Sequence, residues 1–222
     1  MRRSKPRFAP LRVLVTAGPT REPVDPVRYL SNESSGRMGF ALAEAAARAG
    51  HAVTLVAGPV NLPTPARVER IDVGSAREML AACRKAFTIA DVLIMAAAVA
   101  DWRPAKVLAG KWRAKDGGAC RATLALVRNP DILATLAARK GRRRVCGFAL
   151  ETGSGERRAR TKLARKQLDW IVLNDASALN SERTSVLLLD ATGGRTRLSG
   201  SKRKVAAALV RALSTSPSPS RS

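Results

Sequence analysis

The sequence predicts an α/β fold in which a mostly parallel sheet carries helices on both faces. Short runs of β-branched and aliphatic residues alternate with amphipathic helical stretches, as in repeated strand–helix–strand units. The run ADVLIMAAAVAD at 90–101 is apolar almost throughout, as a strand covered on both sides is. Only 4% of the residues are aromatic, so Val, Leu, Ile and Ala must fill the core. The expected architecture is Rossmann-like.

The first half of the chain is expected to form four strands and two helices. Gly50 ends the first helix, and Ser75 is placed to cap the second. The expected strands are Arg12–Gly18, 51–58, Val68–Val73 and 90–101, and the expected helices are Gly36–Ala49 and a second one from Ser75 to Phe87.

The regular alternation breaks between Trp102 and Asn129. This stretch is basic, contains Gly117-Gly118, and alternates at Arg121–Val127 like an edge strand that another chain can cover. We therefore expect a flap or dimerisation arm that leaves the sheet.

The alternation resumes after Pro130, which is placed as the first residue of a helix with Asn129 as its N-cap. A hairpin turn is expected at Gly193-Gly194. The remaining strands are expected at 144–150, 168–174, 185–190 and 195–200, with helices at Glu156–Gln167 and Lys202–Leu213. We expect a basic extension at 1–10, one domain at 11–213 and a disordered low-complexity tail at 214–222.

The net charge of +23 on 222 residues indicates partners that are anionic. Lys and Arg occur in every segment and aromatic residues for base stacking are few, so we favour anionic substrates over nucleic acid, although both stay open. No apolar run approaches the roughly 18 residues of a membrane span, and no signal-peptide pattern follows the N-terminus. Cys83, Cys120 and Cys146 form no C-x-x-C pair. Scattered thiols of this kind fit buried positions in a cytoplasmic protein.

The single histidine, His51, argues against catalytic triads and His-rich zinc sites. It lies between the helix-ending Gly50 and an apolar strand, where we expect a solvated turn residue.

The first strand ends in TAGPT and lacks the three spaced glycines of a dinucleotide fingerprint, with only Gly18 in place. A long loop, Pro19–Ser35, follows, and ordered loops of this length are usually functional. The loop ends in SNESSGRMGF, which puts Ser34, Ser35 and Gly36 at a helix N-terminus that favours an anion. The alternatives are a solvated loop and simple helix capping. Helix capping alone does not account for the two serines together with Asn32 and Arg28 in the same loop.

The apolar run at 90–101 places Asp101 at the carboxyl end of a strand, where open α/β sheets bind ligands, or else as an N-cap or solvated residue. Beyond it, Lys111, Arg113 and Lys115 form a basic cluster. Lys162 and Lys166 lie one turn apart on a helix, an arrangement that an anion would stabilise and that solvent can also accommodate.

A short-chain dehydrogenase on this frame would need Tyr-x-x-x-Lys, but the only tyrosine, Tyr29, is followed four residues later by Glu33. That class is excluded.

Four segments in this order closely resemble phosphopantothenoylcysteine synthetases: residues 16–60, AAAVADWRP at 96–104, VRNPDIL at 127–133 and GFALET at 147–152. The resemblance extends from about Arg12 to Leu213. In many bacteria this domain is the C-terminal half of a bifunctional coenzyme A biosynthesis protein. The resemblance implies a stand-alone synthetase or an excised domain, without flavin, for which a separate phosphopantothenoylcysteine decarboxylase would be a partner.

The resemblance implies that CTP, with Mg²⁺, activates 4′-phosphopantothenate as an acyl-nucleotide, which L-cysteine then attacks in a homodimeric enzyme. Asn32 and Lys111 resemble catalytic residues. The residues that resemble substrate contacts are Arg28, Ser34, Ser35, Gly36, Ala97 and Ala98. The nucleotide-binding set is Gly18, Asp101, Lys111, Asn129, Pro130, Asp131, Ile132, Phe148, Lys162 and Lys166. No metal ligands are assigned.

The family's Lys-x-Lys-Lys motif is altered here to Lys111-Trp112-Arg113-Ala114-Lys115, in which the third lysine is shifted by one position. Arg keeps the charge but not the compact ammonium group of Lys, so the role of Lys115 stays open. The alternative function is a catalytically degenerate, basic α/β module that binds nucleotide or nucleic acid.

Overall fold

The computed structural model describes residues 9–113, 121–151, 155–175 and 183–215. Lys115, Gly117-Gly118 and Cys120 lie outside these ranges, as do most of the basic extension and of the predicted tail. The strands of the large sheet are β1 (Arg12–Ala17), β4 (Ala52–Ala57), β5 (Val68–Asp72), β6 (Val92–Met95), β9 (Arg144–Glu151), β10 (Trp170–Asp175), β11 (Arg183–Asp190) and β12 (Arg195–Ser201). The helices are α1 (Arg37–Arg48), α2 (Ala76–Phe87), α3 (Ile132–Ala137), α4 (Gly155–Arg165) and α5 (Lys202–Thr215).

The eight strands are ordered β12-β11-β10-β9-β6-β1-β4-β5. From β5 to β10 all neighbours are parallel, and β11 and β12 add an antiparallel edge. In chain order the parallel strands are arranged 3-2-1-4-5-6, so the order reverses between β1 and β6. Ligands of doubly wound sheets bind beside such a reversal, at the carboxyl ends of the strands.

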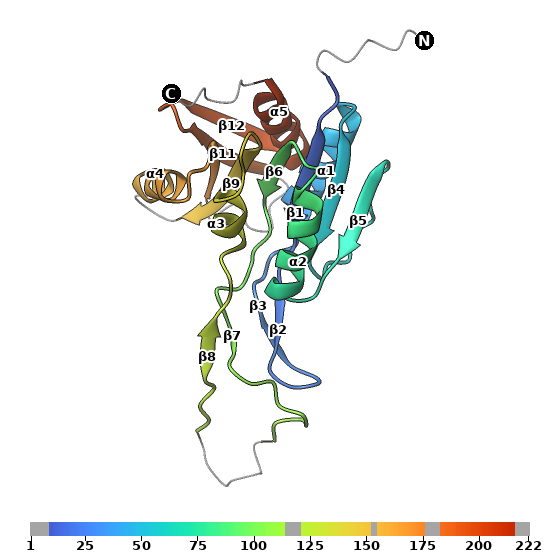
Figure 1. Ribbon diagram of the computed structural model, residues 1–222, viewed down its shortest axis with the longest axis vertical. Coiled ribbons are helices and arrows are strands. Elements are labelled where there is room, and N and C mark those ends of the chain that lie inside the picture. The colour runs from blue at the N-terminus through green and yellow to red at the C-terminus, as the bar shows by residue number, and fades with distance from the viewer. Residues whose placement is uncertain (1–8, 114–120, 152–154, 176–182, 216–222) are drawn as a thin grey trace.

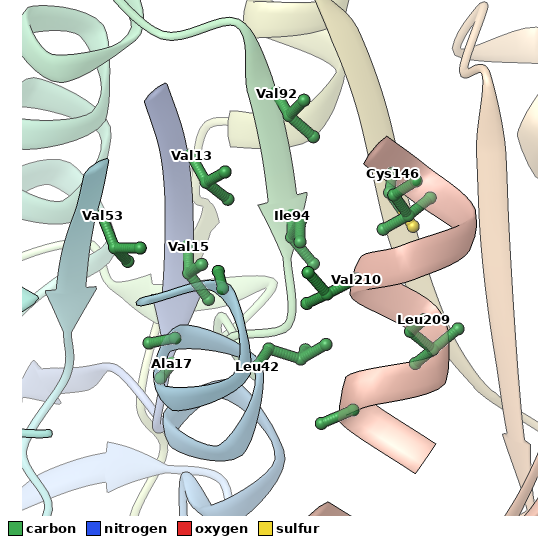
Figure 2. Packing of buried hydrophobic residues seen from close by; sticks show 14 of the residues in the cluster. Val13, Val15, Ala17, Leu42, Val53, Val92, Ile94, Cys146, Leu209 and Val210 are labelled. Carbon is green, nitrogen blue, oxygen red and sulfur yellow. The ribbon is translucent and has the colours of Figure 1, made fainter. Parts of the chain in front are cut away.

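Helices cover both faces of the sheet, which confirms the predicted fold class. Helices α1 and α5 pack on one face, where Val15 and Ile94 of the sheet face Leu42 and Val210 (Figure 2). Helices α2, α3 and α4 pack on the other face around Leu93, Ile132 and other apolar side chains. Cys83 and Cys146 are buried free thiols, as expected.

Gly39 lets α1 approach β1 closely. A Cβ at this position would lie 2.4 Å from the Cβ of Ala17, closer than two carbons can pack. The N-terminus of α1 is therefore fixed against the carboxyl end of β1.

Two short antiparallel ribbons extend from the carboxyl edge of the large sheet (Figure 1). The first, here called the hairpin, is β2 (Arg21–Pro23) paired with β3 (Tyr29–Ser31). The second is β7 (Trp102–Pro104) paired with β8 (Leu126–Arg128), which forms the base of the predicted excursion. We call residues 102–128, in so far as they are described, the arm.

Four local predictions are wrong, and the first three concern the position of a strand or helix. The fourth strand ends at Met95 and not at Asp101, because the following alanines pair with the loop after β1. The strand expected at Arg121–Val127 is confined to Leu126–Arg128 and is covered by β7 of the same chain. Helix α3 begins later than predicted: Asp131 is its N-cap and accepts the Ala134 N–H, because the Asn129 side chain instead donates to the Ala100 carbonyl.

His51 is buried and is not the solvated turn residue that the sequence predicts. Its Nδ1 accepts the Leu11 N–H at 3.2 Å, and its Nε2 lies 3.0 Å from Ser214 Oγ. Ser214 Oγ donates its own proton to the Val210 carbonyl, so Nε2 must be the donor to it. Ser214 belongs to α5, which ends at Thr215, two residues beyond the predicted end at Leu213.

None of the helices in the described ranges is both long and apolar enough to span a lipid bilayer.

Burial, and secondarily the positive charge of Arg144, lower the pKa of His51. The unfolded chain therefore takes up a proton near the ordinary pKa of about 6.5, and the folded protein only at lower pH. The free energy of unfolding should fall as the pH drops below about 6.5. Urea unfolding at pH 8 and pH 5.5 measures this change, with His51→Gln as the control that cannot titrate. Equal pH dependence in both proteins would contradict the assignment.

Candidate functional site

The segments that follow β1 and β6 are joined beyond the sheet. Pro19 and Ala98 form an isolated parallel bridge, in which the Ala98 N–H donates to the Gly18 carbonyl at 2.9 Å. Two threonines reinforce the junction: Thr16 Oγ1 accepts the Ala97 N–H, and Thr20 Oγ1 accepts the Ala100 N–H at 3.0 Å. Both threonines are fully buried. We call residues 16–20 and 96–101 the platform.

Asn32 is attached to this platform. Its Nδ2 donates to the Ala98 carbonyl at 2.8 Å, across 66 residues of sequence. The neighbouring Ser31 Oγ donates to the Thr20 carbonyl. One N–H of the Asn32 amide therefore fixes the side chain beside Ala98, and within the described residues the second N–H has no partner.

The N-terminus of α1 lies on the same side. Gly36 has a left-handed backbone with φ of 74°, and no side chain caps the helix. Gly18 also has positive φ, and its Cα lies 3.4 Å from the position that a Cβ of Gly36 would take. Among the described residues, Ser34 Oγ accepts a hydrogen bond only from the Gly36 N–H, at 3.4 Å. The first N–H groups of α1 are thus left without a side-chain acceptor, as in helix termini that bind anions.

A cavity of about 470 Å³ opens beside the platform, between β6, α3 and α4. It is lined by Met95, Ala97, Val99, Ala100, Asp101, Trp102, Arg128, Asn129, Pro130, Asp131, Ile132, Leu133, Phe148, Lys162, Arg165 and Lys166. The apolar side chains come from β6, the platform, β7, β9 and the N-terminal end of α3. Two of the cations lie on α4, and a third, Lys166, directly follows it. A planar group and an anionic group can therefore be held side by side.

Ion pairs and hydrogen bonds set the charges around the cavity. Lys166 Nζ lies 2.6 Å from Asp131 Oδ2, and Lys162 Nζ donates to the Phe148 carbonyl at 2.8 Å. Burial raises the pKa of the Asp131 carboxyl, but hydrogen bonds from Lys166 and the Ala134 N–H lower it by more, so the net pKa is below its ordinary value. Asp131 is thus ionised at neutral pH and holds Lys166 at the cavity.

The described part of the chain contains no group of three or more His, Cys, Asp or Glu side chains that could hold a metal ion. Mg²⁺ that binds with a nucleotide needs only one or two carboxylates beside the phosphates. Asp101 fits this role because its exposed carboxylate lines the cavity and has no side-chain partner among the described residues.

The structure brings most of the predicted nucleotide set together in this cavity. Asp101, Asn129, Pro130, Asp131, Ile132, Phe148, Lys162 and Lys166 all line it, together with Ala97 of the predicted substrate set. Gly18, Ala98, Asn32, Ser34, Ser35 and Gly36 lie on the adjoining platform and at the N-terminus of α1.

Arg28 and Lys111 do not line the cavity. Arg28 lies in the turn of the hairpin and bonds to Asp25 and to the Trp112 carbonyl of the arm. Lys111 is exposed on the arm, and within the described residues its ammonium group has no partner.

Sequence reasoning missed seven cavity residues: Met95, Val99, Ala100, Trp102, Arg128, Leu133 and Arg165. The Arg128 guanidinium lies 5.4 Å from the centre of the Trp102 ring. Arg165 could have been found, because it precedes Lys166 and lies one helical turn after Lys162. The Trp102–Arg128 pair could not, because it depends on the pairing of β7 with β8.

Comparison with known proteins identifies the family. The family model of the DNA/pantothenate metabolism flavoprotein C-terminal domain matches residues 8–216. The coenzyme A biosynthesis bifunctional protein CoaBC of Escherichia coli K12 is 52% identical over 168 residues, which are 75% of this chain and 41% of that protein. The CoaBC of Haemophilus influenzae is 45% identical over 204 residues, 90% of this chain and 50% of that protein. The chain thus spans about half or less of these relatives.

A crystal structure of the C-terminal domain of a coenzyme A biosynthesis bifunctional protein CoaBC has the same fold. It superposes with a TM-score of 0.81 at 36% identity, over 95% of this chain and 97% of that domain. The match therefore extends over nearly the whole chain. With the family model matching nearly its whole length, the chain belongs to the family of the DNA/pantothenate metabolism flavoprotein C-terminal domain.

Proposed function

We propose that the protein is a phosphopantothenate–cysteine ligase, which joins 4′-phosphopantothenate to L-cysteine in coenzyme A biosynthesis through an acyl-cytidylate. The names of its relatives place them in coenzyme A biosynthesis, which supports the pathway. The observation that carries the proposal is the meeting of a cation-rich cavity with the Asn32 platform at one edge of the sheet.

The reaction has two steps. The carboxylate of 4′-phosphopantothenate attacks the α-phosphorus of CTP, and pyrophosphate leaves. The amine of cysteine then attacks the acyl carbon, CMP leaves and the amine gives up a proton. Both steps bring several anions together. The cations at the cavity and the N-terminus of α1 can offset this negative charge.

Asn32 is suited to the second step. One amide N–H is used in holding the side chain to the Ala98 carbonyl, so the other can donate to the acyl oxygen as negative charge develops there. The carboxamide is neutral and does not repel the phosphates.

Mg²⁺ bound with the nucleotide would neutralise phosphate charge, and Asp101 is the described carboxylate best placed to hold it. We propose CTP as the nucleotide on the basis of the sequence resemblance. Replacing CTP with ATP in the assay below tests this choice directly.

A homodimer is part of the proposal. Exposed apolar side chains are concentrated on the hairpin and the arm, at Val27, Tyr29, Trp102, Val107, Leu126 and Val127. A second copy of the chain would cover them. Light scattering at micromolar concentration should give twice the mass of one chain, and full activity as a monomer would contradict the dimer.

The ligase assay measures steady-state release of pyrophosphate. It should require 4′-phosphopantothenate, CTP and L-cysteine together and should stop when any one is omitted. Nucleotide or nucleic-acid binding without pyrophosphate release would instead support the degenerate binding module.

Replacing Asn32 with aspartate separates the two steps. Ionised aspartate has nearly the same shape but only accepts hydrogen bonds. Asn32→Asp should release one equivalent of pyrophosphate and form the amide roughly 10²–10³-fold more slowly. Mass spectrometry after a gentle quench should detect accumulated acyl-cytidylate. Asn61→Asp, at an exposed position outside the cavity and the platform, is the matched control. Normal amide formation by Asn32→Asp would show that Asn32 is only a loop residue, without a role in the second step.

A further inference from the structure

Asp25 is a buried carboxylate in the turn of the hairpin. Its residue surface is 3% exposed, although it belongs to a turn that projects from the sheet. Oδ1 accepts the N–H groups of Val27 and Arg28, both at 2.9 Å, which closes the turn. Oδ2 accepts Arg28 Nε at 2.8 Å and, 87 residues away in sequence, the Trp112 N–H at 3.0 Å.

The link between the hairpin and the arm has two further hydrogen bonds. The Arg28 guanidinium donates to the Trp112 carbonyl, and the Leu108 N–H donates to the Val24 carbonyl at 2.9 Å. The backbone of Trp112 is therefore held at both its N–H and its C=O. Lys111 immediately precedes Trp112, so its backbone position depends on the same contacts.

We propose that Asp25 is a positioning residue that fixes Lys111 and Arg28 relative to each other, through the Trp112 N–H and the Arg28 guanidinium. This inference rests on the proposed ligase function. Arg28 and Lys111 come from segments far apart in the sequence, and neither lines the cavity. Contacts between the hairpin and the arm must therefore set their relative positions. Among the described residues, Asp25 is the acidic side chain that contacts both segments.

The contact needs a carboxylate. Burial raises the pKa of Asp25, but hydrogen bonds from the N–H groups of Trp112 and Val27 and from Arg28 lower it by more. Its pKa therefore lies well below the ordinary value, and the group is ionised wherever the enzyme works. An asparagine at this position could still close the turn with one oxygen. Its NH₂ group would face two donors, Arg28 Nε and the Trp112 N–H, and would release the arm.

The experiment compares Asp25→Asn with Asp91→Asn. Asp91 is the matched control because it also accepts a backbone N–H and an arginine, those of Arg12, but precedes β6 at the amino end of the sheet. Asp25→Asn should lower kcat/KM for CTP by roughly 10- to 100-fold, the usual cost of a small displacement of a catalytic group. Asp91→Asn should stay within about threefold, and Asp25→Glu, which keeps the charge, should lose less than Asp25→Asn.

A double-mutant cycle shows whether Asp25 acts through Lys111. In the Lys111→Gln background, Asp25→Asn should cost a smaller factor than in the wild-type background, because one of the two groups that it positions is already absent. Equal losses in both backgrounds would overturn the inference, as would wild-type kinetics in Asp25→Asn. Unfolding of both Asp25 variants would assign the residue to global stability and would also overturn it.

Limited trypsin digestion gives a readout without activity. Cleavage after Lys106 and Lys111, mapped by mass spectrometry, should be at least about tenfold faster in Asp25→Asn than in wild type or Asp91→Asn. An unchanged digestion pattern would refute the positioning role. An inactive wild type that still showed this difference would refute only the proposed ligase function.

Discussion

The site depends on one constraint, the joining of the segments after β1 and β6 beyond the edge of the sheet. These two strands flank the reversal in strand order, where neighbouring connections run to opposite faces and leave a crevice. The Pro19–Ala98 bridge and the buried hydroxyls of Thr16 and Thr20 satisfy the backbone there. Most residues of the platform are small, so its backbone is open to a ligand in the crevice. Asn32 can then be held by a carbonyl of this surface.

The cations around this platform come from two kinds of element, a helix and the arm. Lys162 and Arg165 lie on α4, a regular helix packed on the sheet, and Lys166, which directly follows α4, forms an ion pair with Asp131. Lys111 stands on the arm, which is held at its outer part by hydrogen bonds to the hairpin. Packing on the sheet thus holds the cations of α4, and hydrogen bonds to the hairpin hold the backbone next to Lys111.

The sequence predicts the parts of this architecture that depend on local pattern. The alternation of strands and helices, the Ser75 cap of α2 and the Gly193-Gly194 turn were all predictable, and the family motifs predicted most of the cavity. Contacts across long sequence separations were not. His51 is buried by partners 40 and 163 residues away. The apolar run after Met95 is only partly buried, and it leaves β6 to pair with Pro19. The family motif assigned Arg28 to the substrate, and its contact with the Trp112 carbonyl of the arm could not be predicted because it spans 84 residues of sequence.

Hydrogen–deuterium exchange with and without Mg²⁺ and CTP tests most directly whether the cavity beside the platform is the nucleotide site. Binding should slow exchange in peptides that cover residues 97–102 and 128–133 and in α4, where the cavity lining lies. Peptides of α1 and α5 along the groove on the opposite face, which is lined by Ala45, His51 and Val210, should be unaffected. Protection confined to that groove, or none at saturating nucleotide, would contradict the account.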